Sequence, residues 1–292
     1  MIEYRAFNLE EDIDEMVNHI YTYKNKRYDE DLLLWKHTRN PFGKSKGGVA
    51  VYEGKIIASV MYMKYNYQSK DKGVVRCLRG VDGCTAPEHR GKGIFKNLLR
   101  FSLDLHQGNY EFLYANPNEN SHPEMMKVGW KTLNRDFQFR IGIVAPSTRN
   151  YGEISDFDPK HTSKDLYYDY YMSANSTEFL KWRYEGKEYK LKEFSFQNER
   201  HYLAYRNNKY KGIKYIILCD YVGDINSINK AIKALCRYEN CYILYYFPNA
   251  ITNRINFIYT KKDRNSVLIF QENNFQIDDN LIMSCGDAEG IL

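Results

Sequence analysis

Residues 84–99 read CTAPEHRGKGIFKNLL, and this stretch decides the fold. It follows a strand-like segment, Val74–Cys84, and passes through a turn with two glycines into a helix. One apolar face of that helix is formed by Ile94, Leu98, Leu99, Ser102 and Leu105. A strand, a glycine-containing turn and a helix in this order aim backbone N–H groups and the positive end of the helix dipole at one point. The stretch therefore predicts a site suited to a pyrophosphate.

The residues of the turn favour the same kind of ligand. Gly91 and Gly93 allow the backbone to approach a ligand closely, and Arg90 and Lys92 add positive charge. The turn is not a Walker loop, because the spaced Gly-Lys-Ser/Thr phrase is absent, and it does not match G-x-G-x-x-G. These exclusions indicate a pyrophosphate loop of another type.

The loop resembles that of the GNAT (GCN5-related) N-acetyltransferase superfamily, which reads Arg/Gln-x-x-Gly-x-Gly/Ala after a strand. This sequence has Arg90 and Gly93 in that pattern, preceded by Thr85-x-Pro87-Glu88, but Phe95 replaces the last small residue. The resemblance implies that the chain binds acetyl-CoA (coenzyme A). The cofactor-binding residues that it implies are Cys84, Thr85, Arg90, Gly91, Lys92, Gly93, Ile94, Phe95 and Asn118.

A second element of the same family lies downstream, at Asn118–Trp130. It is similar to the family's Asn-x-x-Ala-x-x-x-Tyr-x-x-x-Gly-Phe, with Asn118 in place of the asparagine that meets the coenzyme. Met125 stands where the family has the tyrosine that protonates the leaving thiolate, and methionine cannot donate a proton. The resemblance covers residues 1–145 and implies direct attack of an amine on the thioester.

Three residues are candidates for catalysis. By resemblance, the strand ending near Gly83–Thr85 diverges from Glu111–Ala115, and a backbone N–H near Cys84 binds the oxyanion. Glu119 and then His122 are candidates for the general base, because both lie beside the expected thioester position. A covalent role for the Cys84 thiol has no supporting His/Asp arrangement.

Internal similarity predicts a duplicated architecture. Residues 31–37 align with residues 178–184, and residues 110–118 align with residues 241–249, in the same order along the chain. Where the first copy has its phosphate loop, the second has Tyr221–Asn226, without the basic pair. The second copy is therefore interpreted as degenerate, supporting the first without binding a cofactor of its own.

We expect an α/β protein (an α+β mixed sheet) of two tandem GNAT-like domains. Residues 1–147 would form the N-terminal acetyltransferase domain with the acetyl-CoA loop, and residues 148–292 the degenerate C-terminal domain. Each domain would have a mixed, mostly antiparallel sheet flanked by helices. A strand over Asp136–Val144 would be the last of the first domain.

Composition narrows the partners and the location. The formal net charge of +5, from 42 basic and 37 acidic residues, is too balanced to imply nucleic acid. The longest apolar run, Ile56–Met63, is too short to span a bilayer, and the N-terminus has no signal-peptide pattern. Six cysteines without C-x-x-C spacing favour reduced thiols. We expect a cytoplasmic protein without a metal, nucleic-acid or membrane partner.

The function expected is acetyl-CoA-dependent N-acetyl transfer to a primary amine of a small molecule, such as an amino sugar. Two alternatives stay open: an inactive GNAT-like binding module, which Phe95 and Met125 favour, and an acyl or aminoacyl transferase of the same fold. Tyr62, Tyr65 and Tyr67 lie on a strand that often lines acceptor sites in the family, although strand aromatics more often pack in a core. The acceptor and the oligomeric state do not follow from the sequence.

Overall fold

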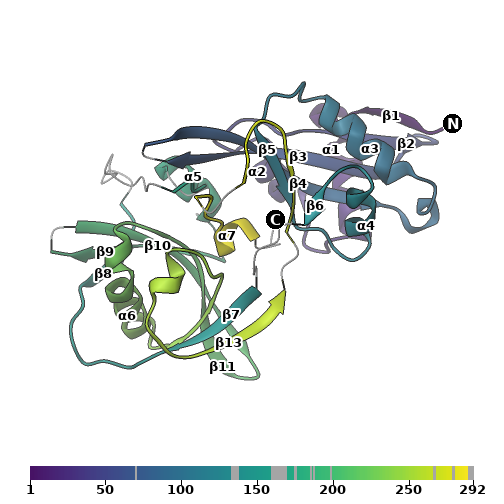
Figure 1. The fold of residues 1–292 in the computed structure, drawn as a ribbon. Helices are drawn as coiled ribbons and strands as arrows, with labels where there is room; N and C mark the ends of the chain where they lie inside the picture. The colour runs from purple at the N-terminus through teal and green to yellow at the C-terminus, as the bar shows by residue number, and fades with distance from the viewer. Residues whose placement is uncertain are drawn as a thin grey trace.

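The structure is a computed structural model of the 292-residue chain. It describes residues 1–69, 71–132, 138–158, 170–173, 176–184, 186, 188–197, 199–265, 268–277 and 280–288. Within these residues the chain forms two seven-stranded mixed sheets flanked by helices, which confirms the expected α/β architecture. Figure 1 shows the first sheet, in purple to teal, at the upper right and the second, mostly green, at the lower left.

The first sheet carries the glycine-containing loop. Its strand order is β1 (Glu3–Ala6), β2 (Lys46–Tyr52), β3 (Lys55–Ser69), β4 (Gly73–Thr85), β5 (Phe112–Ala115), β14 (Ile269–Glu272) and β6 (Lys131–Thr132). Neighbouring strands are antiparallel, except that β4 and β5 are parallel. Because side chains alternate along a strand, β3 turns Met61 to one face and Val60 and Tyr62 to the other.

Helices cover the two faces of this sheet. The face with Met61 packs against α1 (Leu9–Tyr23) and α2 (Glu30–His37), which connect β1 to β2. The opposite face packs against α3 (Ile94–Asp104), which connects β4 to β5, and α4 (Ser121–Met126). Burial of the α3 residues Leu98 and Leu99 confirms the amphipathic helix expected after the loop.

The second sheet repeats this arrangement. Its strand order is β8 (Glu153–Asp156), β9 (Lys190–Phe196), β10 (Glu199–Tyr210), β11 (Ile213–Val222), β12 (Ile243–Tyr246), β7 (Gln138–Val144) and β13 (Phe257–Asn265). Here β11 and β12 are the parallel pair, and α6 (Ile228–Glu239) connects them as α3 connects β4 and β5. Helix α5 (Thr177–Tyr184) precedes β9 as α2 precedes β2, and α7 (Cys285–Ala288) lies near the end of the chain.

Each sheet takes one strand from the other half of the chain. Strand β7 pairs with β12 and β13 in the second sheet, and β14 pairs with β5 and β6 in the first. The boundary expected at residue 147 therefore does not separate the two sheets. The strand expected over Asp136–Val144 as the last of the first domain is found from Gln138 in the second sheet, and residues 136 and 137 lie outside the described residues. Alternating side chains identify a strand without identifying its partner.

A tryptophan pair joins the two repeated segments. The rings of Trp35 on α2 and Trp182 on α5 stack with their centroids 5.1 Å apart. Trp35 Nε1 donates to the Trp182 carbonyl at 2.7 Å, and Trp182 Nε1 donates to the Trp35 carbonyl at 2.9 Å. These reciprocal bonds place α2 and α5 in equivalent positions, as the sequence similarity predicts. A shared core with Tyr65, Phe179 and Tyr202 continues around the pair.

The structure also shows the state of the cysteines, the possible metal ligands and the character of the helices. All six cysteines are buried and free of disulfides. Within the described ranges, no group of His, Cys, Asp and Glu side chains is arranged to hold a metal ion. In the same ranges no helix has the length and apolar character needed to cross a membrane.

Candidate active site

The loop between β4 and α3 presents an uncapped helix end. Gly93 is the N-cap of α3 in a left-handed conformation, with φ of +74°, and it provides no side-chain capping bond. The N–H of Asn97 donates to the Gly93 carbonyl at 3.1 Å, so the amides of the preceding turn have no acceptor within the helix. A Cβ on Gly93 would meet nothing within 4 Å. The space in front of this helix end therefore fits an anionic group such as a pyrophosphate.

An outer cavity of 260 Å³ lies in front of this loop. Of the cofactor residues predicted from the sequence, six line it, namely Cys84, Thr85, Arg90, Gly93, Phe95 and Asn118. Gly91 and Lys92 are exposed beside the cavity, and Ile94 turns into the core behind it. Arg90 Nε donates to the Thr85 carbonyl at 3.0 Å, which folds this side chain across the mouth of the loop.

A deep cavity of 210 Å³ continues from the outer one. It opens where the parallel strands β4 and β5 separate, because their pairing ends at Gly80 and Ala115. Beyond this point Val81, Asp82 and Gly83 line one side, and residues 116–118 line the other. The divergence of the two strands expected from the sequence is thus confirmed, and it leaves the facing edge of β4 unpaired with β5.

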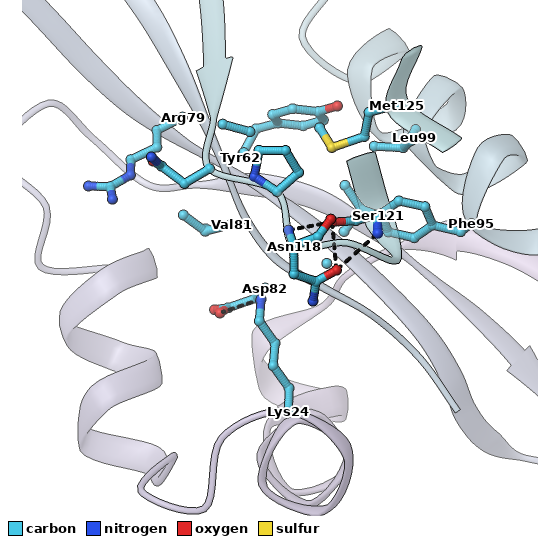
Figure 2. A pocket seen from close by; sticks show the side chains of 16 residues that line it. Lys24, Tyr62, Arg79, Val81, Asp82, Phe95, Leu99, Asn118, Ser121 and Met125 are labelled. Carbon is cyan, nitrogen blue, oxygen red and sulfur yellow. Dashed lines mark hydrogen bonds and ion pairs between the residues drawn. The ribbon is translucent and has the colours of Figure 1, made fainter. Parts of the chain in front are cut away.

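The two cavities form one groove. Lys24, Gly83, Phe95, Asn118 and Ser121 line both, and this shared set is called the waist. At the waist the Phe95 ring lies against Gly83, where an added Cβ would come within 3.1 Å of the ring. The missing side chain of Gly83 therefore makes room for the bulky residue that replaces a small one in the loop pattern. Figure 2 shows the Phe95 ring on the same side of the deep cavity as Leu99.

Asn118 is fixed on the opposite side of the waist. Its Oδ1 accepts from the backbone N–H groups of Asn120 and Ser121 at 3.0 and 2.9 Å. Its own N–H donates to Ser121 Oγ at 3.0 Å. These bonds hold the turn between β5 and α4 against the groove, and Figure 2 shows those between Asn118 and Ser121. Ser121, which was not predicted as a site residue, owes its place at the waist to this turn.

Asp82 is the buried anion of the site, and the sequence analysis missed it. Its carboxylate accepts from Lys36 Nζ at 2.9 Å and from the Tyr28 hydroxyl at 2.7 Å, and it lies 2.9 Å from His37 Nε2. Burial opposes ionisation, but the Lys36 ammonium and the His37 hydrogen bond hold the pKa of Asp82 well below its usual range. Burial in turn lowers the pKa of Lys36 to about 8.

This buried cluster anchors an irregular part of β4. Asp82 has φ of +49°, and the register between β3 and β4 shifts at this point. Ser59 Oγ donates to the Asp82 carbonyl at 2.8 Å and fixes the bulge from β3. The signal in the sequence was the Asp82-Gly83 dipeptide inside a strand pattern, which favours a bulge. The side chain of Asp82 thus positions the backbone that lines the groove.

The three predicted catalytic residues lie in different surroundings. Glu119 is exposed and His122 is half-buried, and neither lines the outer or the deep cavity. His122 Nε2 lies 3.5 Å from Thr132 Oγ1. Cys84 lines the outer cavity, and burial raises the pKa of its thiol, which disfavours the reactive thiolate. The groove brings Cys84 to the loop without bringing either proposed base to the strand separation.

Comparisons with known proteins agree with this geometry. Residues 3–131 match the family model described as "Acetyltransferase (GNAT) domain". The fold matches a GCN5-related N-acetyltransferase from Anabaena variabilis ATCC 29413, with a TM-score of 0.70 and 12% identity over 93% of this chain and 73% of that one. No curated protein matches the sequence.

Two further solved structures share the fold. One is a conserved protein of unknown function from Enterococcus faecalis V583, described as a probable N-acyltransferase, with a TM-score of 0.69 and 14% identity over 94% of this chain and 73% of that one. The other is a GCN5-related N-acetyltransferase from Kribbella flavida, with a TM-score of 0.64 and 12% identity over 94% of this chain and 72% of that one. At such identities these matches establish the fold alone.

Proposed function

We propose, from the premise that residues 3–131 form a GNAT acetyltransferase domain, that the chain transfers an acetyl group from acetyl-CoA to a primary amine of a small molecule. The observation that carries the proposal is the continuous groove from the α3 N-terminus to the separation of β4 and β5. A groove with an anion site at one end and unpaired strand edges at the other suits a long phosphorylated thioester.

Each of the two cavities would bind a different part of acetyl-CoA. The first-turn amides of α3 and Arg90 would hold the pyrophosphate, because both offer donors in a positive field. The unpaired edge of β4 near Gly83, opposite Asn118, would hold the pantetheine arm and the thioester oxygen. Acetyl-CoA would supply an acetyl group activated as a thioester. The second half of the chain would support this domain without binding a coenzyme.

The surroundings of Asp82 bear on how the amine loses its proton. Asp82 is the carboxylate that lines the deep cavity among the described residues, and it is already bound by Lys36, Tyr28 and His37. Its lowered pKa makes it a weak proton acceptor. We therefore expect the amine to reach the site deprotonated through solvent, so that the pH dependence of the rate follows the pKa of the amine itself.

A thiol-release assay with acetyl-CoA and a panel of primary amines tests the function. We expect thiol release that requires an amine and yields the N-acetylated product by mass spectrometry. Two accepted amines with different pKa values should give rate profiles whose inflections differ accordingly. An inactive binding module would bind acetyl-CoA and release no thiol with any amine, and this result would contradict the proposal. A preference for longer acyl-CoAs would instead identify an acyltransferase of the same fold.

A further inference from the structure

Tyr62 lies at the point where β4 and β5 separate. In the β3–β4 register Tyr62 pairs with Gly80, and Gly80 pairs with Ala115 at the last step of the parallel β4–β5 ladder. A Cβ on Gly80 would lie 3.6 Å from Cε1 of Tyr62, which is next to the carbon that carries the hydroxyl. The hydroxyl end of this ring therefore lies beside the vertex of the deep cavity.

The hydroxyl of Tyr62 is buried without a partner. The side chain is 0% exposed, and its oxygen has no hydrogen bond among the described residues. The residue lines the deep cavity, and Figure 2 shows its hydroxyl directed toward the Met125 side of it. Because buried polar groups are rarely left unpaired, this hydroxyl is a candidate for bonding to a ligand. Burial also raises the pKa of Tyr62, so the group remains a donor at neutral pH.

Two of the other polar side chains near this vertex are already engaged. Ser121 Oγ exchanges hydrogen bonds with Asn118, and the carboxylate of Asp82 is held by the cluster on α2. Lys24 Nζ lies 3.9 Å from Asp82 at the mouth of the deep cavity. Met125, on the wall that faces Tyr62, has no proton to donate. Tyr62 thus combines an available O–H donor with a position at the strand separation.

We propose that Tyr62 is the proton donor to the leaving sulfur, an inference that rests on the proposed function. As the amine nitrogen forms its bond to the acyl carbon, the C–S bond breaks and its electron pair remains on sulfur. Tyr62 passes its hydroxyl proton to that sulfur. Solvent then returns to the Tyr62 oxygen the proton that the amine nitrogen has lost. The net products are the amide and the free thiol, and Tyr62 is restored.

The first test measures binding, using Tyr62→Phe and the matched control Tyr67→Phe. Tyr67 lies on the same strand, is 0% exposed and has a hydroxyl without a described partner, but it does not line the groove. Calorimetry with CoA and with desulfo-CoA, which lacks the sulfur, is run at a pH where the thiol ionises. We expect Tyr62→Phe to weaken CoA binding about tenfold, as for loss of a hydrogen bond to a charged group. Desulfo-CoA binding should not change, and Tyr67→Phe should alter neither.

The second test measures turnover in the thiol-release assay. Loss of a proton donor should lower kcat of Tyr62→Phe about 100-fold with little change in the KM for the amine, while Tyr67→Phe keeps the native values. Equal CoA affinity and equal kcat in Tyr62→Phe and the native protein would overturn this inference alone. A native protein that binds neither CoA nor desulfo-CoA would overturn the proposed function, and this inference with it.

Discussion

The two halves of the chain build the same separation between parallel strands, and they fill it differently. Between β4 and β5 the N-terminal half leaves a deep cavity of 210 Å³ that joins an outer cavity of 260 Å³. Between β11 and β12 the C-terminal half leaves a cavity of 10 Å³, about enough for one water. The difference comes from residues 280–288, the segment that ends in α7 and lines this remaining space through Ser284 and Cys285.

The turn after the second parallel strand has the same geometry in both halves. Asn249 Oδ1 accepts from the N–H groups of Ile251 and Thr252 at 2.9 Å each, as Asn118 Oδ1 does from the turn before α4. Among the described residues, the asparagine amide nitrogen bonds to the chain only in the C-terminal half, where Asn249 Nδ2 donates to the Met283 carbonyl at 3.0 Å. The segment thus lies opposite Asn249 as the proposed coenzyme would lie opposite Asn118.

Other contacts fix the segment in place. Arg183 donates to the Gly286 carbonyl at 2.9 Å, and the Tyr184 hydroxyl donates to Asp220 beside it. A Cβ on Gly286 would overlap the Tyr184 hydroxyl, so the close approach requires glycine. Arg183 and Tyr184 occupy on α5 the positions of Lys36 and His37 on α2. The equivalent helices therefore hold different elements in place. Helix α2 holds the bulge in β4, and α5 holds residues 280–288, which fill the space beside β11 and β12.

The largest effect on stability should come from the tryptophan pair that joins the halves. Removing either Trp35 or Trp182 leaves a cavity and unpairs a partly buried carbonyl, so each change to alanine should cost about 3–5 kcal/mol of unfolding free energy. Because the two residues share their contacts, the double variant should cost less than the sum. Urea unfolding of the three variants measures this. A severe loss for one and a mild loss for the other would show that the halves are not equivalent.

A smaller effect should be the loss of folding stability at acid pH that is caused by protonation of His19. This residue lies on α1, behind the open groove. Burial lowers the pKa of His19 to about 4 from its ordinary value of 6.5. Because the folded-state pKa is the lower one, the stability is fully present above pH 6.5 and is lost as the pH falls toward 4. The loss reaches about 3 kcal/mol. His19→Leu should remove it in urea unfolding at a series of pH values.

His201 of the C-terminal half provides the contrast for this experiment. Its Nδ1 accepts from the backbone N–H of Asp224 at 3.1 Å and lies 3.1 Å from the Tyr221 hydroxyl. His201→Leu removes these bonds, so we expect stability to fall at every pH. The acid sensitivity that persists in His19→Leu should come from the other groups whose pKa is lowered in the folded protein. Among them are His106, whose pKa burial lowers to about 4, His37 and the Asp82 carboxylate. An unchanged pH profile in His19→Leu would contradict the assignment.

The smallest effect should separate the roles of the two asparagines. Asn249→Ala removes the turn bonds and the bond to Met283, so it should lower the free energy of unfolding by about 1–2 kcal/mol. Asn118→Ala should cost less stability and should weaken acetyl-CoA binding instead. Urea unfolding and calorimetry on both variants measure the two quantities. Coenzyme binding impaired by Asn249→Ala alone would reverse the comparison.

Local patterns predicted the parts of the fold that depend on neighbours in sequence. The strand before the loop, the helix after it and the repeat around Trp35 and Trp182 follow from periodicity and similarity, and the structure contains all of them. The exchange of β7 and β14 was missed, because alternation in a strand does not identify its partner. The packing of the Phe95 ring against Gly83 could not be predicted from the sequence either, because it depends on how closely α3 approaches β4.

The candidate site was predicted to a similar extent. The outer cavity, where we propose that the pyrophosphate binds, follows from the backbone chemistry that a glycine-containing turn indicates, and six of the predicted residues line it. The deep end depends on side chains that β3, β4 and α2 bring together. The family resemblance indicated Tyr62 through its strand, but no motif identified Lys36 or Asp82 as site residues. Glu119 and His122 were chosen by position along the chain. The turn at Asn118 brings their neighbours Asn120 and Ser121 to the groove, while Glu119 and His122 line neither cavity.

Calorimetric titration with acetyl-CoA tests the central claim most directly. The claim is that the N-terminal half binds the coenzyme, while residues 280–288 fill the equivalent space in the C-terminal half. We expect one coenzyme per chain for the native protein and no binding for Gly93→Trp, whose side chain would extend into the open space before α3. The control is Asn226→Trp, at an exposed position before α6, which should bind as the native protein does. Two coenzymes per chain, or binding that survives in Gly93→Trp, would contradict this account.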